Sequence, residues 1–110
     1  MPAFDATELG AMLQLVQSYD PRHPHPDVRA LAALDDRSSE VLLALVEADS
    51  LRSAAARLGM HHSTVQARHE ALTKTLGYDP RSNLGRMRYI AAALLYRFTD
   101  SLPPHLGGSR

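Results

Sequence analysis

Residues 51–70 constrain the fold of this chain more than any other segment, because they meet three demands of a helix-turn-helix. Ala55 is a small residue at the point where two steeply crossed helices bring their backbones together. Gly59 follows the first of these predicted helices, where the turn needs a positive φ that costs little only for glycine. Val65 lies on the second helix and fills the corner between the two. The predicted core of the motif is Ala55, Leu58, Gly59, Met60 and Val65.

The rest of the chain also has helical periodicity. Apolar residues recur at intervals of three and four, and Gly59 and Gly77 are predicted to end the two helices they follow. The predicted helices cover residues 6–18, 27–34, 38–48, 51–58, 62–76 and 84–98. No segment alternates apolar and polar residues for long enough to indicate a strand. We therefore predict an all-α fold of five or six helices around the helix-turn-helix, with no sheet.

The first 26 residues are predicted to form an amphipathic helix followed by a linker rich in proline and histidine. Asp5 and Glu8 fit an N-terminal capping pair for this helix. Three prolines within residues 21–26 exclude helix and central strand there, so we predict an extended linker. The helix has two possible uses, which are to cover the core of its own chain or to pair with a second copy. Its apolar stripe consists of Leu9, Met12, Leu13 and Val16.

We predict three parts in the chain. Residues 1–26 are the N-terminal helix and linker, and residues 27–100 are the helix-turn-helix domain. Residues 101–110 contain one Pro-Pro and one Gly-Gly pair and are predicted to be a disordered tail. The last helix is apolar nearly all round from Met87 to Phe98, which predicts burial at the centre of the fold or in a dimer interface.

Length and composition exclude several classes of protein. A chain of 110 residues suffices for one hydrophobic core, and the absence of cysteine excludes a disulfide framework, a thiolate zinc finger and a cysteine nucleophile. No apolar run reaches the roughly 18–20 residues of a membrane span, and the N-terminus lacks a signal-peptide pattern. We therefore expect a cytoplasmic protein without a membrane partner.

Catalysis and metal binding have no support in the sequence. It contains neither a glycine-rich phosphate loop nor a recognisable nucleophile with an adjacent base, so we expect no enzymatic activity and no cofactor. His62 and His69 are two helical turns apart, too far to share one zinc ion, and His23 with His25 lacks further ligands nearby. We expect no metal site.

The neutral total charge conceals two halves of opposite sign. Residues 1–50 carry three basic and nine acidic residues, whereas residues 51–110 carry nine basic and three acidic ones. A basic half favours a polyanionic partner. The alternative is intramolecular, with the two halves facing each other in one fold, and the sequence leaves both open.

The chain from about Val28 to Phe98 resembles the C-terminal helix-turn-helix domain of PucR-like (CdaR-like) bacterial transcription regulators. LysR-type regulators have a similar alanine-rich hairpin but continue into a strand-bearing wing, whereas here an apolar helix follows. The matching residues are Ala33-Leu34-Asp35, Ser50-Leu51, Ala54 to Leu58, His61, Thr64, Val65, Arg68, Leu76 to Pro80 and Leu94 to Arg97.

The sequence departs from that family in two respects. His62, Ser63 and Ala67 stand where the family tends to hold arginine, asparagine and tyrosine, which makes this face less basic. The family domain also usually follows a larger sensory region, which does not fit into residues 1–27. The chain is accordingly either an excised domain or a stand-alone regulator.

The helix at 62–76 is the predicted recognition helix. Its buried stripe is predicted at Val65, Leu72 and Leu76, with position 68 or 69 between them. The outward residues are then His62, Ser63, Gln66, Ala67 and Glu70. Gln66 can pair with adenine through two hydrogen bonds, and serine or histidine can bond other base edges. The predicted base-reading residues are His62, Ser63, Gln66 and Ala67.

Affinity for the DNA backbone would come from side chains that neutralise or contact phosphate. The predicted phosphate contacts are Arg52, Arg57, Thr64, Arg68 and Lys74, and Arg81, Arg86 and Arg88 complete the pool of basic side chains. Thr64 has a second possible role as a helix cap. An ordinary solvated or ion-paired surface role is the alternative for each arginine taken singly.

These observations predict sequence-specific binding of double-stranded DNA by a bacterial transcription regulator that works as a homodimer. The helix at 62–76 would enter the major groove. The alternative function is a helical protein–protein interaction or dimerisation module that does not bind DNA.

Overall fold

A computed structural model describes the backbone of residues 8–101 and the side chains of residues 8–97. These residues form six α-helices and no strand, which confirms the predicted all-α fold. The helices are α1 (Ala11–Gln17), α2 (Pro26–Ala32), α3 (Asp36–Glu47), α4 (Leu51–Leu58), α5 (His62–Leu76) and α6 (Asn83–Ser101).

Helix α3 forms the centre of the hydrophobic core. Val41, Leu42 and Leu45 on this helix are almost completely inaccessible to solvent. Helices α4 and α5 pack on α3, while α2 packs mainly on α6. The core therefore joins the helix-turn-helix to the last helix through one buried cluster that also contains Tyr78, Tyr89 and Ala92.

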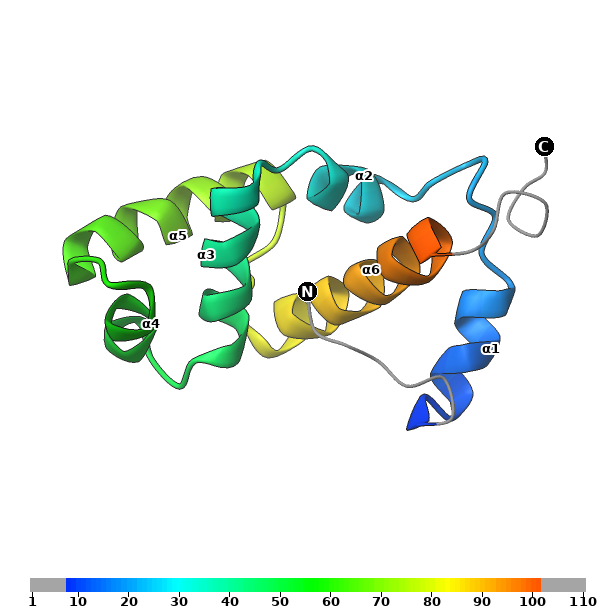
Figure 1. Ribbon diagram of the computed structural model, residues 1–110, viewed down its shortest axis with the longest axis horizontal. Coiled ribbons are helices and arrows are strands. Elements are labelled where there is room, and N and C mark those ends of the chain that lie inside the picture. Colours follow the sequence, from blue (N-terminus) through cyan, green and yellow to red (C-terminus); the bar gives the residue numbers. More distant parts are fainter. Residues whose placement is uncertain (1–7, 102–110) are drawn as a thin grey trace.

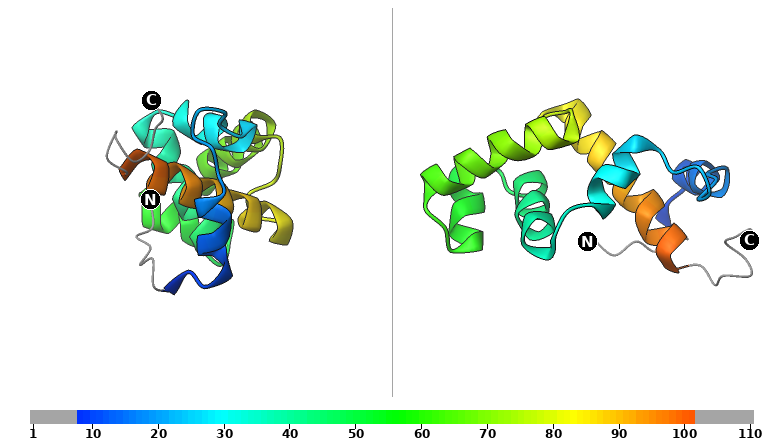
Figure 2. Two further views of the ribbon diagram at one scale, coloured as in Figure 1. Left: turned by 90° about the vertical axis from the view of Figure 1, so that its right-hand side faces the viewer. Right: turned by 90° about the horizontal axis from the view of Figure 1, so that it is seen from above.

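The molecule is elongated, with principal extents of 45 × 26 × 22 Å. Helices α4 and α5 lie at one end and α1 lies at the other, with α2, α3 and α6 between them (Figures 1 and 2). This arrangement separates the outer surface of α5 from that of α1.

The first helix is shorter than predicted. It begins at Ala11 instead of residue 6, because Gly10 has φ 58° and ψ −132°, a conformation through which an α-helix cannot continue. Glu8 lies before the helix, Asp5 lies outside the described residues, and no side chain caps α1. Leu9 is buried, but no residue within α1 is, so the predicted stripe covers the core only in part.

The segment before α2 is a turn instead of a fully extended linker. Asp20 accepts hydrogen bonds from the backbone and side chain of Arg22, and the Tyr19 hydroxyl accepts one from the backbone N–H of His25. Pro26 is already the first residue of α2, where a missing N–H costs nothing. His25 caps that helix by accepting from Asp27 N–H at 3.0 Å.

The last helix is longer than predicted, and only one side of it is buried within the described part of the chain. It extends to Ser101, which was predicted to start the tail; residues 102–110 of that tail lie outside the described residues. Tyr89, Ala92, Ala93 and Leu94 are buried, whereas Leu84, Met87 and Ile90 are exposed. No described helix covers the side of α6 on which Leu84, Met87 and Ile90 lie. No helix among the described residues is long and apolar enough to cross a membrane.

An ion pair joins α2 to α6. The Arg88 guanidinium donates to both carboxylate oxygens of Asp27, at 2.9 and 3.1 Å, and lies 4.4 Å from the ring centre of Tyr78. Hydrogen bonding from Arg88 holds the pKa of the Asp27 carboxyl below its ordinary value. Burial raises the pKa of Tyr78 to about 12, so this phenol stays neutral beside the pair.

The Asp27–Arg88 pair predicts a pH-dependent effect of Asp27→Asn. A carboxyl whose pKa is lowered in the folded state adds stability above its unfolded pKa of about 3.9 and loses it as the pH falls through the folded value. We expect the free energy of unfolding of the variant at pH 7 to be lower by about 1 kcal/mol. The loss is no larger because water partly screens the charge of Arg88. Urea unfolding at pH 7 and pH 2 measures this loss. An equal loss at both pH values would contradict the assignment.

Candidate nucleic-acid interface

The turn between α4 and α5 has the predicted helix-turn-helix geometry. Gly59 has φ 67° and ψ 33°, the left-handed conformation expected from the sequence. Met60 N–H donates to the Ala55 carbonyl and Gly59 N–H donates to that of Ala56, which is the Schellman pattern of helix ends. At the other end of α4, Ser50 and Ser53 form a reciprocal capping box. Both ends of α4 are thus fixed by local hydrogen bonds.

The predicted core of the motif packs as expected. Ala55 and Val65 are buried, and Leu58 and Met60 are half-buried against the core. Ala54, which was not predicted as a core residue of the motif, is fully buried. Small side chains at 54 and 55 allow the close approach of α4 to its neighbours.

Helix α5 lies on the core along one stripe and turns the rest of its surface to solvent. Val65, Leu72 and Leu76 are buried, as predicted, and Arg68 and His69 between them are half-buried. Gly77, with φ 83°, ends the helix. All five residues of the predicted outward arc are exposed, namely His62, Ser63, Gln66, Ala67 and Glu70. No described helix covers this arc, so it is accessible to a large partner.

The start of α5 lacks a side-chain cap. His61 occupies the cap position and makes no capping hydrogen bond with its side chain. Thr64, for which capping was one predicted role, is exposed and its backbone N–H donates to the His61 carbonyl. The side chain of Thr64 is thus not used as a cap.

The predicted phosphate-contacting residues differ in their surroundings. Arg52 and Lys74 are exposed, while Arg68 is half-buried and its charge contributes to a lowered pKa of Asp35, after the hydrogen bonds from Ser38. Arg57 donates to Glu47 at 2.7 Å through one nitrogen of its guanidinium, so the carboxylate already neutralises part of its charge. Such an exposed pair contributes little to stability, and the remaining N–H groups of Arg57 can still contact a phosphate.

Two arginines of the basic pool, Arg81 and Arg88, make hydrogen bonds inside the fold. Arg81 donates to the carbonyls of Leu45, Ala48 and Asp49 at 2.7, 2.8 and 3.0 Å, at the C-terminus of α3. Arg88 binds Asp27, as described above. Both arginines stabilise the packing of helices instead of forming a free cationic surface.

These contacts bear on the opposite charges of the two halves. Arg57 and Arg88 from the basic half pair with Glu47 and Asp27 from the acidic half. Part of the charge asymmetry is therefore internal to the fold, as the intramolecular alternative predicted. Arg52 on α4 and Lys74 on α5 are exposed.

A polar contact that the sequence did not predict joins α5 to the loop before α6. His69 lies 2.8 Å from Asp79 through its Nε2 atom, and Asp79 also accepts from Arg81 N–H at 2.8 Å. Hydrogen bonding with His69 is the main reason that the pKa of Asp79 is lowered. This contact ties the middle of α5 to the loop before α6. The spacing of ten residues across a glycine turn gave no periodic signal for it.

No group of three or more histidine, cysteine, aspartate or glutamate side chains among the described residues could hold a metal ion. No family model matches the sequence, and neither a curated protein nor a solved structure matches the chain.

Proposed function

We propose that this chain binds double-stranded DNA, with α5 in the major groove, as part of a bacterial transcription regulator. The observation that carries the proposal is the combination of a left-handed Gly59 turn with an uncovered outer surface on α5. In helix-turn-helix proteins the second helix enters the groove and its N-terminal residues contact base edges. The resemblance to PucR-like regulators supports the same function.

The exposed side chains on α5 suit base reading. Gln66 offers a donor and an acceptor on one amide, which match adenine N7 and N6, and the methyl group of Ala67 suits the thymine methyl. Ser63 and His62 add shorter polar groups near the start of the helix. Within residues 8–97, whose side chains are described, none of these four residues makes a side-chain hydrogen bond or ion pair that would have to be broken first.

Salt dependence tests the proposal directly. If about four cationic side chains (Arg52, Arg57, Arg68 and Lys74) contact phosphates, log affinity should fall with log salt with a slope of about −3 to −4 for each copy bound. Fluorescence anisotropy with labelled random duplex at several salt concentrations measures that slope. The absence of duplex binding at low salt would contradict the proposal and favour the protein-interaction alternative.

Gln66→Ala and Lys74→Ala separate base reading from phosphate contact. On a duplex selected from a randomised pool, Gln66→Ala should cost about 1–3 kcal/mol of discrimination at one base pair and leave binding to random duplex nearly unchanged. Lys74→Ala should weaken binding to the selected and the random duplex similarly, and should make the slope of log affinity against log salt shallower by about one. Both effects are read from titrations of specific and random duplex.

Arg22→Ala is the matched control for these variants, because Arg22 is an exposed arginine between α1 and α2, away from α4 and α5 (Figure 1). It should change neither the slope nor the specificity. If Gln66→Ala weakened specific and random duplex equally, Gln66 would not be a base reader.

A further inference from the structure

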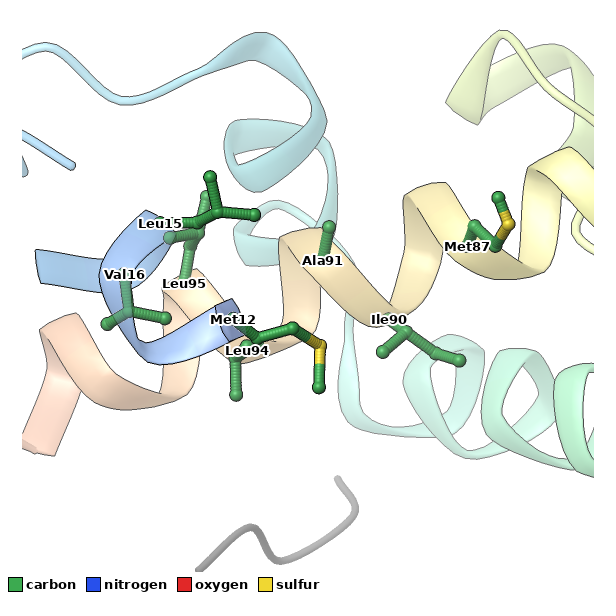
Figure 3. Close-up of a pocket in the computed structure, with 8 residues that line it drawn as sticks. All are labelled: Met12, Leu15, Val16, Met87, Ile90, Ala91, Leu94 and Leu95. Carbon is green, nitrogen blue, oxygen red and sulfur yellow. The ribbon is translucent and has the colours of Figure 1, made fainter. Parts of the chain in front are cut away.

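An apolar groove of about 430 Å³ lies between α1 and α6. Met12, Leu15 and Val16 line it from α1, and Met87, Ile90 and Leu94 line it from α6 (Figure 3). Every side chain in its lining is apolar. Sites for small metabolites usually contain a few polar groups that orient the ligand. The groove instead has the character of a surface that accepts apolar side chains of a protein.

The exposed apolar surface of the chain is concentrated here. Among the described residues, all five large hydrophobic side chains that are strongly exposed lie on α1 or α6, and Leu15, Leu84 and Met87 are 67%, 65% and 60% exposed. The other two are Met12 and Ile90. A contiguous patch of this kind on a small protein marks an interaction site.

The patch is self-complementary. Helix α1 crosses the half of α6 that carries Leu94 and Leu95, and leaves Met87 and Ile90 uncovered on the other half (Figure 3). Leu15 is itself exposed on α1. Along α6, one copy thus carries first the exposed residues Met87 and Ile90 and then the part that α1 covers. A two-fold axis reverses this order in the second copy, so that α1 of each copy faces Met87 and Ile90 of the other.

We propose that this patch joins two copies of the chain in a symmetric dimer, with the α6 helices antiparallel and the two-fold axis near Ile90. No charged side chain lines the groove between α1 and α6, which agrees with the depletion of charge at interface cores. Arg88, which flanks Met87 in the sequence, is already neutralised by Asp27 within the same chain. Its charge therefore does not oppose the approach of a second copy.

The size of the patch sets the strength of the dimer. An interface built on five exposed side chains in each copy is small, near the lower limit of about 1,000–1,200 Å² of total buried surface for specific interfaces. We therefore expect a micromolar, reversible dimer. The proposed dimer does not require DNA binding, because the patch lies on α1 and α6 and shares no residue with the outward arc of α5.

Sedimentation velocity of the full chain between about 1 and 500 μM tests the proposal. We expect a monomer–dimer equilibrium with a micromolar Kd. Met87→Glu places a charge in the middle of the interface and should weaken the dimer at least tenfold. Ala56→Glu adds the same charge at an exposed position on α4 and should leave the equilibrium unchanged. Circular dichroism verifies that both variants fold.

A cysteine variant tests the position of the axis. The chain contains no cysteine, so Ile90→Cys can form a disulfide only between two copies. Near a two-fold axis its Cβ atoms would come within the roughly 4 Å that a disulfide requires. We expect a covalent dimer under mild oxidation from Ile90→Cys and none from Ala56→Cys. If Ile90→Cys formed no covalent dimer under the same oxidation, the proposed position of the axis would be wrong.

Three other outcomes would overturn the proposed interface. They are a chain that stays monomeric up to 500 μM, a dimer that Met87→Glu does not weaken, and a monomer whose groove is filled by a different protein or by an apolar small molecule. Loss of DNA binding alone, with the dimer intact, would contradict the proposed function and leave the interface supported.

Discussion

Replacing Gly85 by alanine is expected to lower the free energy of unfolding by about 3 kcal/mol or more. A Cβ atom at this position would overlap the carbonyl oxygen of Asp79 and lie 2.8 Å from the Ser82 hydroxyl oxygen. The overlap is with backbone, which cannot rotate away. Glycine-to-alanine changes within helices usually stabilise by up to about 1 kcal/mol, so the expected effect has the opposite sign.

Gly77→Ala is the matched comparison for Gly85→Ala. Gly77 has φ 83° but open space where a Cβ would stand, so alanine there costs only backbone strain of about 1–2 kcal/mol. Urea denaturation of both variants should therefore give a clearly larger loss for Gly85→Ala. A loss of less than 1 kcal/mol at Gly85 would mean that α6 shifts away from the Asp79 carbonyl at little cost.

Arg81→Ala is expected to lower the free energy of unfolding by about 2–3 kcal/mol, the second-largest effect among these variants. Its guanidinium binds three carbonyls at the C-terminus of α3, and their removal leaves acceptors of that helix end without this partner. Arg81→Lys keeps the charge but lacks the planar fork that reaches all three oxygens, so it should recover only part of the loss. Chemical denaturation of the three proteins measures the series.

Arg52→Ala serves as the control for Arg81→Ala, since Arg52 is exposed on α4 and should change stability by less than about 0.5 kcal/mol. If Arg81→Ala were as mild as Arg52→Ala, the contact with α3 would contribute little to folding, and the two arginines would be equivalent surface cations.

The helix-turn-helix could be predicted from the sequence because its determinants are local. Ser50, Gly59 and Gly77 each fix a helix end through the conformation or hydrogen bonds of a few adjacent residues. The outward face of α5 followed from the spacing of Val65 and Leu72, since one period assigns every position to a side of the helix. The functional roles of that face stay predictions.

Contacts between distant segments could not be predicted in the same way. The acceptors of Arg81 are backbone carbonyls 32 to 36 residues earlier, and any sequence supplies carbonyls. Arg88 and Asp27 are 61 residues apart, and nothing in their neighbourhoods pairs them. The α1–α6 groove exists only once the two helices are placed side by side, whereas the apolar run of α6 alone left open whether the helix is buried at the centre of the fold or in a dimer interface.

The elongated shape of the molecule has a consequence for its evolution. The outer arc of α5 and the patch on α1 and α6 share no residue and are separated by the core around α3 (Figure 1). Substitutions at such distant surfaces act additively on stability. Selection can therefore change one surface without affecting the other. Purifying selection should act most strongly on the contacts that hold both ends of the molecule together, such as those of Arg81 and of the buried leucines of α3.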